Sequence, residues 1–593
     1  MSSHVEAGQT PAEPAAMPYS DPKLVASYGN LNQAMPYGNS NQTMTNNNPN
    51  EPMMLGDPDQ AENPYTTAKS FNSTDSGTIE GFGSYAAQPY SGGPIVEKAA
   101  GQTGQTADGY ASGYTYPPPL PLVVDAEGRP VAWDWNTDPA NPYNWSKGRK
   151  WAQVAIFSTV ALTTSISTSI MSPAHTELML DFGVGSTAAI LPLTFYVLAL
   201  GIGPIIIGGP LSEVIGRYPI IVVGLPVGLL FTVGAALVPS SSLAGLCVLR
   251  FLAGFAFSPS LAIASGVLTE TFKPVERGPP VAIFILMPFL GPGMGPVLGA
   301  FAARKGWRWT QWTVVFFATL SFILTLTGGR ETFHPVLKRR RAKELGITLP
   351  PEDRSPDIPW TTRIHSFLTI GLIRPLHMLV AEPIIGLSCL YVACEFATLF
   401  SFFAAVPFVF QVVYAFDREK CGLVFVSIIV GCCLGLMTVH LTDAQIYRKR
   451  HVPRFHPEPP SPEHRLYAAM IGSIGLPIGL FWFGWSGYHD AHWASTAVAI
   501  VPFAWGNICI FISLMQYMGD TYAGAVVASA ASANGLARYL LASVFPLFTI
   551  QMYEKLGINW ASSLLGFVSV ALLPVPWLFY KFGPRIRAHS RYT

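Results

Sequence analysis

The sequence predicts an all-α polytopic membrane protein with twelve transmembrane helices, arranged in two six-helix halves behind a disordered N-terminal arm. Three observations predict this class. Half of the 593 residues are apolar and only 12% are charged, whereas soluble domains carry about 25% charged residues. Apolar runs long enough to cross a bilayer recur along the chain. A polar stretch divides these runs into two equal groups, as in chains built from two structural repeats.

The N-terminal arm covers residues 1–130 and is rich in Asn, Gln, Gly, Pro, Ser and Thr. Residues 1–132 carry 13 acidic and 4 basic side chains. Such a composition buries too little apolar surface to offset the entropy lost on folding, so we expect a disordered, polar, cytosolic arm. A regulated tail with phosphorylation sites and an uncommitted polar extension are equally good interpretations of it. An entry segment at 131–150 leads into the first span.

Apolar runs of about 20 residues, the length that crosses a bilayer as a helix, follow the entry segment. The twelve predicted spans are 151–172, 187–208, 219–239, 243–267, 279–302, 310–329, 383–407, 421–442, 466–484, 493–518, 522–550 and 559–580. The first six form an N-terminal half at 151–329, and the last six form a C-terminal half at 383–580. A cytosolic central loop at 330–382 separates the halves, and a cytosolic tail at 581–593 follows the last span.

The positions of Lys and Arg predict the orientation of these spans. With the N-terminus in the cytosol, 24 of the 32 basic residues beyond position 132 fall on the cytosolic side and six on the other. Cytosolic loops of membrane proteins carry such an excess, so we expect both termini inside. The three bases at 304–308 are the exception. Because the bases lie between spans rather than in one patch, no nucleic-acid partner is expected.

The loop between the second and third spans reads GPLSEVIGRYP at 209–219. Glycine and proline suit its tight turns. Glu213 and Arg217 are four residues apart, close enough to pair if the turn is helical, and such a pair at the membrane edge would latch one conformation. This pattern resembles the loop motif of the major facilitator superfamily (MFS) at Gly209, Glu213, Gly216 and Arg217. The resemblance implies the twelve-helix MFS fold.

The fifth span carries Gly291, Gly295 and Gly299, which recur every four residues and therefore form one helical stripe. Such a stripe lets another helix approach closely, and Pro296 removes a backbone donor and favours a kink. The pattern G-x-x-x-G-P-x-x-G is similar to the antiporter motif of the superfamily. That motif is found in proton-driven exporters, so the resemblance implies outward transport.

Arg250 lies inside the apolar fourth span, where a lipid-exposed arginine costs about 2.5–3.5 kcal/mol on insertion scales. It should therefore face the bundle interior. In its L-R-F-L-A-G context it matches the family arginine associated with proton transfer. Arginine does not itself release a proton near neutrality, so we expect it to tune a carboxylate or an ordered water. A structural tie to backbone carbonyls is the alternative.

Glu395 interrupts the seventh span, where an ionised carboxylate is costly unless it is paired or protonated. It is a candidate proton carrier and a candidate partner for a cationic substrate; a satisfied structural acid is the alternative. Many relatives carry their acid shortly before the proline of this span, where this chain has Ala404 and Ala405. Polar and aromatic side chains of the same half complete a candidate cavity for flat or amphipathic compounds. These are Phe396, Phe400, Asn507, Asn534 and Arg538, for which helix packing is the alternative.

The run DPANPYNWS at 138–146 resembles the entry segment of fungal twelve-span drug:proton antiporters, and ETFHPVL at 331–337 and FPLF at 545–548 are similar to pieces of the same family. The resemblance covers about residues 133–590. It implies proton-coupled export of drugs, toxins or secondary metabolites across the plasma membrane by alternating access. The expected partners are a small molecule, protons and the lipid bilayer, with no cofactor or metal, and we expect a monomer.

Other functions stay open at this point. One is a dedicated exporter of a polyamine or of a single endogenous secondary metabolite. Another is a transporter-like receptor that signals through the arm without flux. An enzyme is not expected, since no Ser-His-Asp or metal-ligand constellation stands out. The chain also lacks a P-loop, which leaves ATP-driven pumping without support. A vacuolar membrane is the alternative address.

Overall fold

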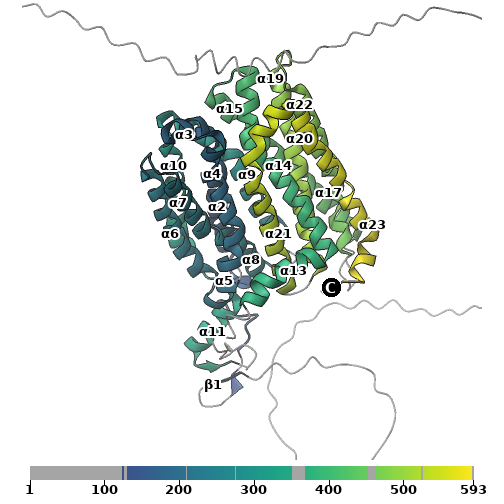
Figure 1. Ribbon diagram of the computed structural model, residues 1–593. Helices are drawn as coiled ribbons and strands as arrows, with labels where there is room; N and C mark the ends of the chain where they lie inside the picture. Colours follow the sequence, from purple (N-terminus) through teal and green to yellow (C-terminus); the bar gives the residue numbers. More distant parts are fainter. Residues whose placement is uncertain are drawn as a thin grey trace, which may run out of the picture. The chain divides into compact units, whose positions relative to one another are not determined.

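The computed structural model describes residues 123–125, 130–131, 133–208, 210–273, 276–349, 367–451, 461–522 and 525–590. These belong to one compact unit that spans residues 119–593 and is built almost entirely of helices (Figure 1). Most of the predicted arm lies outside the described residues, as does Gly209 of the loop motif. Strand β1 (Val123–Asp125) falls inside the predicted arm, so regular structure begins before residue 130.

The N-terminal half follows the predicted order of spans. Pro259 stands at the first turn of the second helix of span four, where its missing N–H is tolerated. The helices are α2 (Lys147–Ser169), α3 (His175–Phe182), α4 (Ser186–Gly203), α5 (Pro210–Ile215), α6 (Arg217–Leu237), α7 (Leu243–Phe257), α8 (Pro259–Thr271), α9 (Gly278–Ala302) and α10 (Arg308–Gly328).

The C-terminal half is preceded by α13 (Arg374–Ala381) and begins with the long helix α14 (Pro383–Tyr414), which runs through the middle of that half. The further helices are α15 (Arg418–Val424), α16 (Val426–Thr442), α17 (Tyr467–Gly472), α18 (Gly475–Ser486), α19 (Trp493–Val498), α20 (Ile500–Thr521), α21 (Ala525–Val544), α22 (Pro546–Leu572) and α23 (Val575–Arg587).

Within the described residues, eleven helical stretches are long and apolar enough to cross a bilayer, and each matches a predicted span. The predicted span 522–550 is the twelfth, and it corresponds to α21 and the start of α22. It is less apolar because α21 carries Asn534 and Arg538. The break that the sequence places between 550 and 559 falls at Gly557, whose positive φ of 77° turns the chain within α22.

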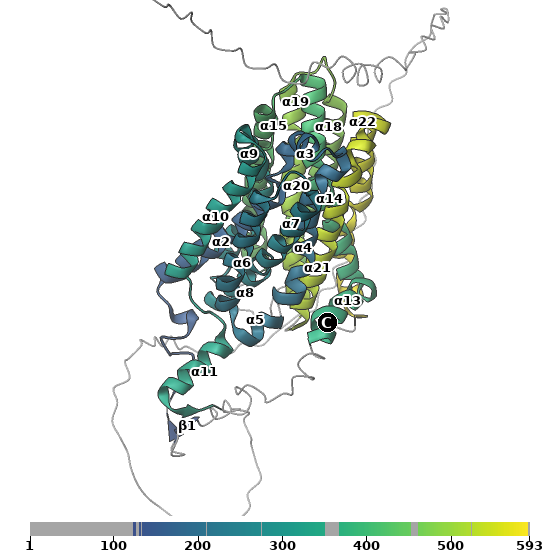
Figure 2. The same cartoon turned by 60° about the vertical axis from the view of Figure 1, so that its left-hand side comes forward.

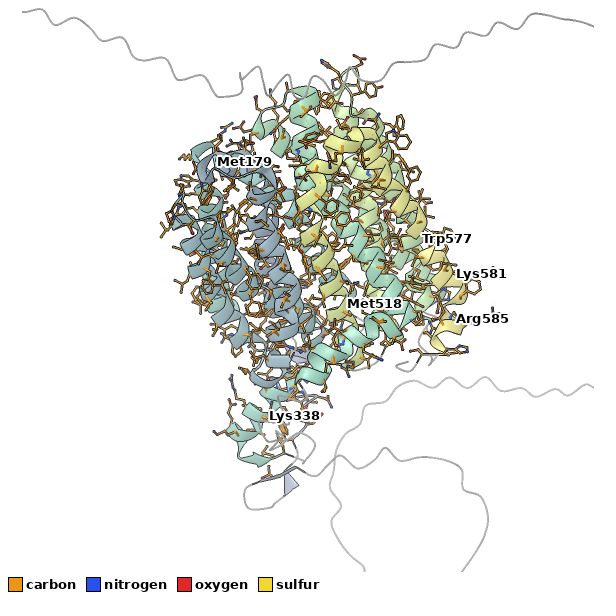
Figure 3. All side chains as sticks on the ribbon, viewed as in Figure 1. Met179, Lys338, Met518, Trp577, Lys581 and Arg585 are labelled. Carbon is orange, nitrogen blue, oxygen red and sulfur yellow. The ribbon has the colours of Figure 1, made fainter. Side chains whose placement is uncertain are left out.

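The two ends of the helix bundle differ. Helices α3, α15 and α19 lie at one end, and α11 (His334–Leu345) and the C-terminus lie at the other (Figures 1 and 2). We call these the far end and the basic end, because α11 carries five Lys and Arg residues at 338–343. Figure 3 shows Lys338 at the basic end and Met179 at the far end. A three-stranded antiparallel sheet that the sequence did not predict lies beside α11, with β1 between β2 (Pro130–Val131) and β3 (Ile347–Thr348).

The exposed surface of the helices is strongly apolar. Helix α14 is buried along most of its length, whereas other helices turn large apolar side chains outward. Examples are Val223 and Leu230 on α6, Phe316 and Ile323 on α10, and Met437 on α16. A soluble protein rarely leaves so much contiguous apolar surface in water, so these faces are the lipid-facing surface of a membrane protein.

Candidate functional site

Arg217 begins α6 at the basic end and pairs with Glu270 near the end of α8. Its Nη2 lies 3.0 Å from Glu270 Oε1, its Nε donates to the same oxygen at 3.1 Å, and its Nη1 donates to Ser212. The predicted pairing of Arg217 with Glu213 is wrong, because Glu213 is exposed and Arg217 reaches across to α8 instead. The ion pair of Arg217 thus joins spans three and four rather than lying within one turn, and its role as a conformational latch stays a prediction.

Gly216 and Glu331 fix the start of α6. Glu331 follows span six, and its carboxylate accepts hydrogen bonds from the backbone nitrogens of Arg217 and Tyr218 at 3.0 and 3.1 Å. These N–H groups have no partner within the helix, and a negative charge suits a helix N-terminus. Gly216 has φ of 110°, and a Cβ placed on it would lie 2.3 Å from Glu331 Oε2. Only glycine fits this position.

The entry segment is folded onto the same network. Trp135 Nε1 donates to His334 Nδ1 at 3.2 Å, and His334 Nε2 lies 2.8 Å from the backbone oxygen of Glu270. Asp138 accepts from Trp133 at 2.8 Å and pairs with Arg341 of α11 at 3.2 Å. Burial lowers the pKa of the His334 imidazole, and its hydrogen bond to Glu270 acts in the opposite direction.

The predicted glycine stripe of span five is confirmed as a close helix contact. Cβ atoms placed on Gly291, Gly295 and Gly299 would lie 2.1–2.3 Å from atoms of α2 or of Ile170, the residue that directly follows it. Pro296 has no N–H to donate to the carbonyl of Pro292; Ser169 Oγ of α2 donates to that carbonyl at 3.2 Å instead. The stripe therefore joins α9 to α2, while its role in antiport stays a prediction.

Arg250 is fully buried on α7 and is bonded inside the N-terminal half. It donates to Ser167 O at 2.5 Å, to Ser167 Oγ at 2.8 Å and to Pro192 O at 3.4 Å. Its Cζ lies 4.2 Å from the ring centroid of Tyr196. In the part of the chain that the structure describes, no carboxylate pairs with it. This geometry supports the tie to backbone carbonyls and offers no acid for Arg250 to tune.

Glu395 is 2% exposed on α14, and in the described residues neither carboxylate oxygen has a hydrogen-bond partner. Asn507 on α20 and Asn534 on α21 are 1% exposed, and both have buried amide nitrogens that lack an acceptor within those ranges. Unpaired buried polar atoms are rare in folded proteins. The C-terminal half therefore holds buried polar groups on α14, α20 and α21 that have no hydrogen-bond partner among the described residues.

Arg538 lies one turn after Asn534 and is enclosed by aromatic rings. Its Cζ lies 4.5 Å from the ring centroids of Phe396 and Tyr539 and 4.8 Å from that of Phe511. Phe289 of α9 packs on Phe511 and Phe396 with centroid distances of 4.8 and 5.3 Å. Three rings of the C-terminal half therefore surround the Arg538 guanidinium, and Phe289 of the N-terminal half packs on two of them.

The structure joins some of the predicted site residues and separates others. Phe396 and Phe400 stack with centroids 6.4 Å apart, next to Arg538. Arg250 and Glu395, the predicted proton-coupling pair, lie in opposite halves, and every hydrogen bond of Arg250 stays in its own half. Sequence reasoning missed Glu270, Glu331, Phe289 and Phe511. The acids at the ends of spans four and six were the available signal for the first two.

This fold, with two helical halves and unpaired polar groups buried in membrane-length helices, is that of a polytopic membrane transporter. The Major Facilitator Superfamily profile matches residues 157–546, and the chain belongs to that family. It is a transporter rather than an enzyme.

Named relatives are transporters as well. The chain is 37% identical over 492 residues to Polyamine transporter 4 of Saccharomyces cerevisiae, covering 78% of this chain and 73% of that protein. It is 34% identical over 464 residues to an efflux pump of Gibberella moniliformis, covering 77% of this chain and 76% of that pump. A crystal structure of a D-xylose-proton symporter aligns with a TM-score of 0.52 at 16% identity, covering 72% of this chain and 97% of that one, a likeness of fold alone.

Proposed function

We propose that this protein exports small organic compounds, such as drugs, toxins or secondary metabolites, across the plasma membrane in exchange for protons. The two halves would alternate access to the site around Glu395 and Arg538. Membership of the superfamily and the similarity to an efflux pump support transport and its direction. The proton coupling rests on the site itself.

The observation that carries the proposal is the unpaired carboxyl of Glu395. An ionised carboxylate buried without a donor is strongly disfavoured, so the arrangement around Glu395 suits its neutral, protonated form. To release the proton, the carboxyl needs a conformation in which water or a cation reaches it. Opening of one side of the protein supplies that change, and a proton would thereby be carried across with each cycle.

Contacts between the halves at the far end support a rocking motion. Arg418 of α15 pairs with Glu177 of α3 and donates to Ala303 O at 2.9 Å. Arg304 pairs with Glu419 at 2.7 Å, and Ser172 Oγ donates to Phe403 O at 2.6 Å. Each contact joins the N-terminal half to the C-terminal half, so opening of the far end must break them. The two ion pairs are partly exposed and therefore weak enough to be broken reversibly.

The basic end would face the cytosol. Helix α11 and the last turn of α23 both carry Lys or Arg there (Figure 3), as the excess of positive charge on cytosolic loops requires. Both termini would then be cytosolic, and the far end would open to the outside of the cell.

Inside-out vesicles with an acidic lumen test the proposal, because export then appears as uptake of a labelled compound. We expect uptake by the full chain from a panel of ethidium, spermidine and 2-naphthoate, abolished by a protonophore. Glu395→Gln mimics a permanently protonated carboxyl, so it should lose pH-driven uptake and keep exchange of labelled for unlabelled compound. Glu554→Gln, a partly exposed acid on α22, is the matched control. If the full chain moves no member of the panel under a pH gradient, the export proposal fails.

The panel also separates the alternatives. A dedicated polyamine exporter, suggested by the relative from Saccharomyces cerevisiae, would move spermidine alone. A receptor without flux would bind a compound and move none.

A further inference from the structure

We infer that the site around Arg538 binds the carboxylate of a flat aromatic organic anion, which names the substrate class of the proposed exporter and rests on that proposed function. The inference comes from the chemistry of the groups that meet there. Arg538 and Asn534 offer nitrogen donors, and the surrounding rings offer a flat apolar enclosure.

The donors lie on one face of α21. Asn534 and Arg538 are four residues apart, so their side chains are neighbours on the helix. In the described part of the chain, the buried Nδ2 of Asn534 and the buried Nε of Arg538 have no acceptor, and no carboxylate forms an ion pair with Arg538. Nε is one of the nitrogens of the planar guanidinium fork, which matches a carboxylate through two parallel hydrogen bonds. A single carboxylate would satisfy both unpaired groups.

Open space adjoins α21 at Gly535, which lies between these donors in the sequence. A Cβ placed on Gly535, three residues before Arg538, meets no atom within 4 Å. Gly201 of α4 approaches Tyr539 so closely that its Cβ would lie 3.1 Å from the Tyr539 Cβ. The site is therefore at the boundary between the halves, where α4 packs against α21 and Phe289 of α9 packs on Phe396 and Phe511, so a ligand bound there would contact both halves.

The rings decide the shape of the ligand. Phe289 and Phe511 form a close pair with centroids 4.8 Å apart, and Phe396 and Tyr539 close further sides. Aromatic rings pack best against other flat apolar groups. One guanidinium and one neutral amide balance a single negative charge, so a monocarboxylate fits better than a phosphate dianion.

The same geometry disfavours a cationic ligand. A guanidinium at the half boundary repels a second positive charge. Glu395 does not offset this repulsion, because in the described residues it forms no ion pair with Arg538 and the proposed function takes its buried carboxyl as neutral. It also precedes Phe396 by one residue and so projects from α14 about 100° away from it. Phe396 is the residue of this pair that faces Arg538.

Three probes that share one ring system test the inference: 2-naphthoate, the neutral 2-naphthamide and the cation 2-naphthylmethylammonium. Binding to the purified full chain in detergent is measured by titration calorimetry. We expect 2-naphthoate to bind at least about 10-fold more tightly than either analogue, the difference made by a charged hydrogen bond. Equal affinity for the acid and the amide, or tighter binding of the ammonium, overturns the inference and needs no variant.

Two variants locate the site. Arg538→Gln should weaken the binding of 2-naphthoate about 10- to 100-fold, and it should weaken the binding of 2-naphthamide less than about threefold. Asn534→Asp supplies an internal carboxylate that would pair with Arg538 in place of the ligand. This variant should keep a folded site and weaken the binding of 2-naphthoate by a similar factor. Lys581→Gln on α23 (Figure 3) is the control and should leave all affinities unchanged. Equal losses of affinity for 2-naphthoate and 2-naphthamide would mean that Arg538 contributes packing alone and does not bind the carboxylate.

Failure of this inference is distinguishable from failure of the proposed function. Arg538-dependent binding of 2-naphthoate without pH-driven uptake supports the site and contradicts proton-coupled export. Proton-driven uptake of ethidium or spermidine by a chain that does not bind 2-naphthoate supports export and contradicts the site.

Discussion

Arg465 and Asp520 repeat in the C-terminal half the pairing of Arg217 and Glu270 in the N-terminal half. Arg465 Nε lies 2.7 Å from Asp520 Oδ2, and Arg217 Nε lies 3.1 Å from Glu270 Oε1. In each case an arginine before or at the start of the third span of its half meets an acid at the end of the fourth. The two halves thus hold equivalent charge pairs at the basic end, although only the first loop carries the recognisable motif.

These pairs predict unequal losses of stability. The side chains of Arg217 and Glu270 are 13% and 12% exposed, whereas those of Arg465 and Asp520 are 23% and 39% exposed. Glu270→Gln should therefore lower the free energy of unfolding by about 1–3 kcal/mol, and Asp520→Asn by about 0.2–1 kcal/mol. Denaturation midpoints in detergent measure both. Because the sites lie in different halves, the double variant should show the sum. A larger cost for Asp520→Asn contradicts this prediction.

Gly216→Ala should destabilise the start of α6. Alanine is strained at φ of 110°, and its Cβ would displace the Glu331 carboxylate from the backbone nitrogens that it caps. We expect a loss of about 1–3 kcal/mol, measured as a lower thermal midpoint. Gly148→Ala is the control, because a Cβ there meets nothing within 4 Å and its φ is ordinary. Equal midpoints for the two variants would falsify the role assigned to Gly216.

The fold was predictable because each membrane-spanning helix requires a long run of apolar residues, which is visible in the sequence. The spans and the halves follow from the lengths of the apolar runs alone. A close helix contact in span five follows from the four-residue spacing of Gly291, Gly295 and Gly299. The loop sequence predicted an ionic partner for Arg217 but named the wrong acid. Glu213 is near in sequence, whereas Glu270 is 53 residues away and comes close only after spans three and four pack.

The sequence predicts which residues belong to the site, but it does not predict which of them lie together. Glu395, Asn534 and Arg538 stand out as polar residues in apolar spans. The sequence does not show which groups Arg250 binds, or that Phe289 packs on the rings around Arg538. Those relations depend on which helices of the two halves meet, which local patterns do not encode. The small sheet around β1 was missed for the same reason, because its strands have only two or three residues each and lie far apart in the chain.

Gly299→Ala should disrupt the seam between α9 and α2 more than Gly295→Ala. The Cβ at position 299 would lie 2.1 Å from Ile170 O, a backbone atom, whereas the Cβ at 295 first meets Ser169 Oγ. We expect losses of about 1–3 kcal/mol for both, from overpacking. Adding Ser169→Ala should recover part of the Gly295→Ala loss and none of the Gly299→Ala loss. Thermal midpoints of the four variants decide this, and identical rescue of both glycine variants contradicts it.

His334 should make the protein less stable in acid. Its folded pKa is lowered below the ordinary value of 6.5 by burial, so the unfolded chain binds protons first as the pH falls. Stability from the neutral imidazole is complete above pH 6.5 and is lost as the pH falls through the folded pKa. Protonated His334 also cannot accept from Trp135. Thermal midpoints between pH 7.5 and 5 should fall less in His334→Gln than in the unsubstituted protein. His589→Gln, at an exposed site, is the control, and its midpoint should fall as much as that of the unsubstituted protein.

Arg250 should be essential for export, and the structure suggests a way to find the reason. Its guanidinium joins α7 to Ser167 of α2, Pro192 of α4 and Gln311 of α10. Arg250→Ala is expected to abolish pH-driven export while the protein still reaches the cell surface. If Arg250 serves proton coupling, exchange of labelled for unlabelled compound should survive in the variant, because exchange needs no net proton movement. If Arg250 only ties the four helices together, exchange and pH-driven export should fall together, with a lower thermal midpoint. Proton-dependent efflux that persists in Arg250→Ala removes this residue from the mechanism altogether.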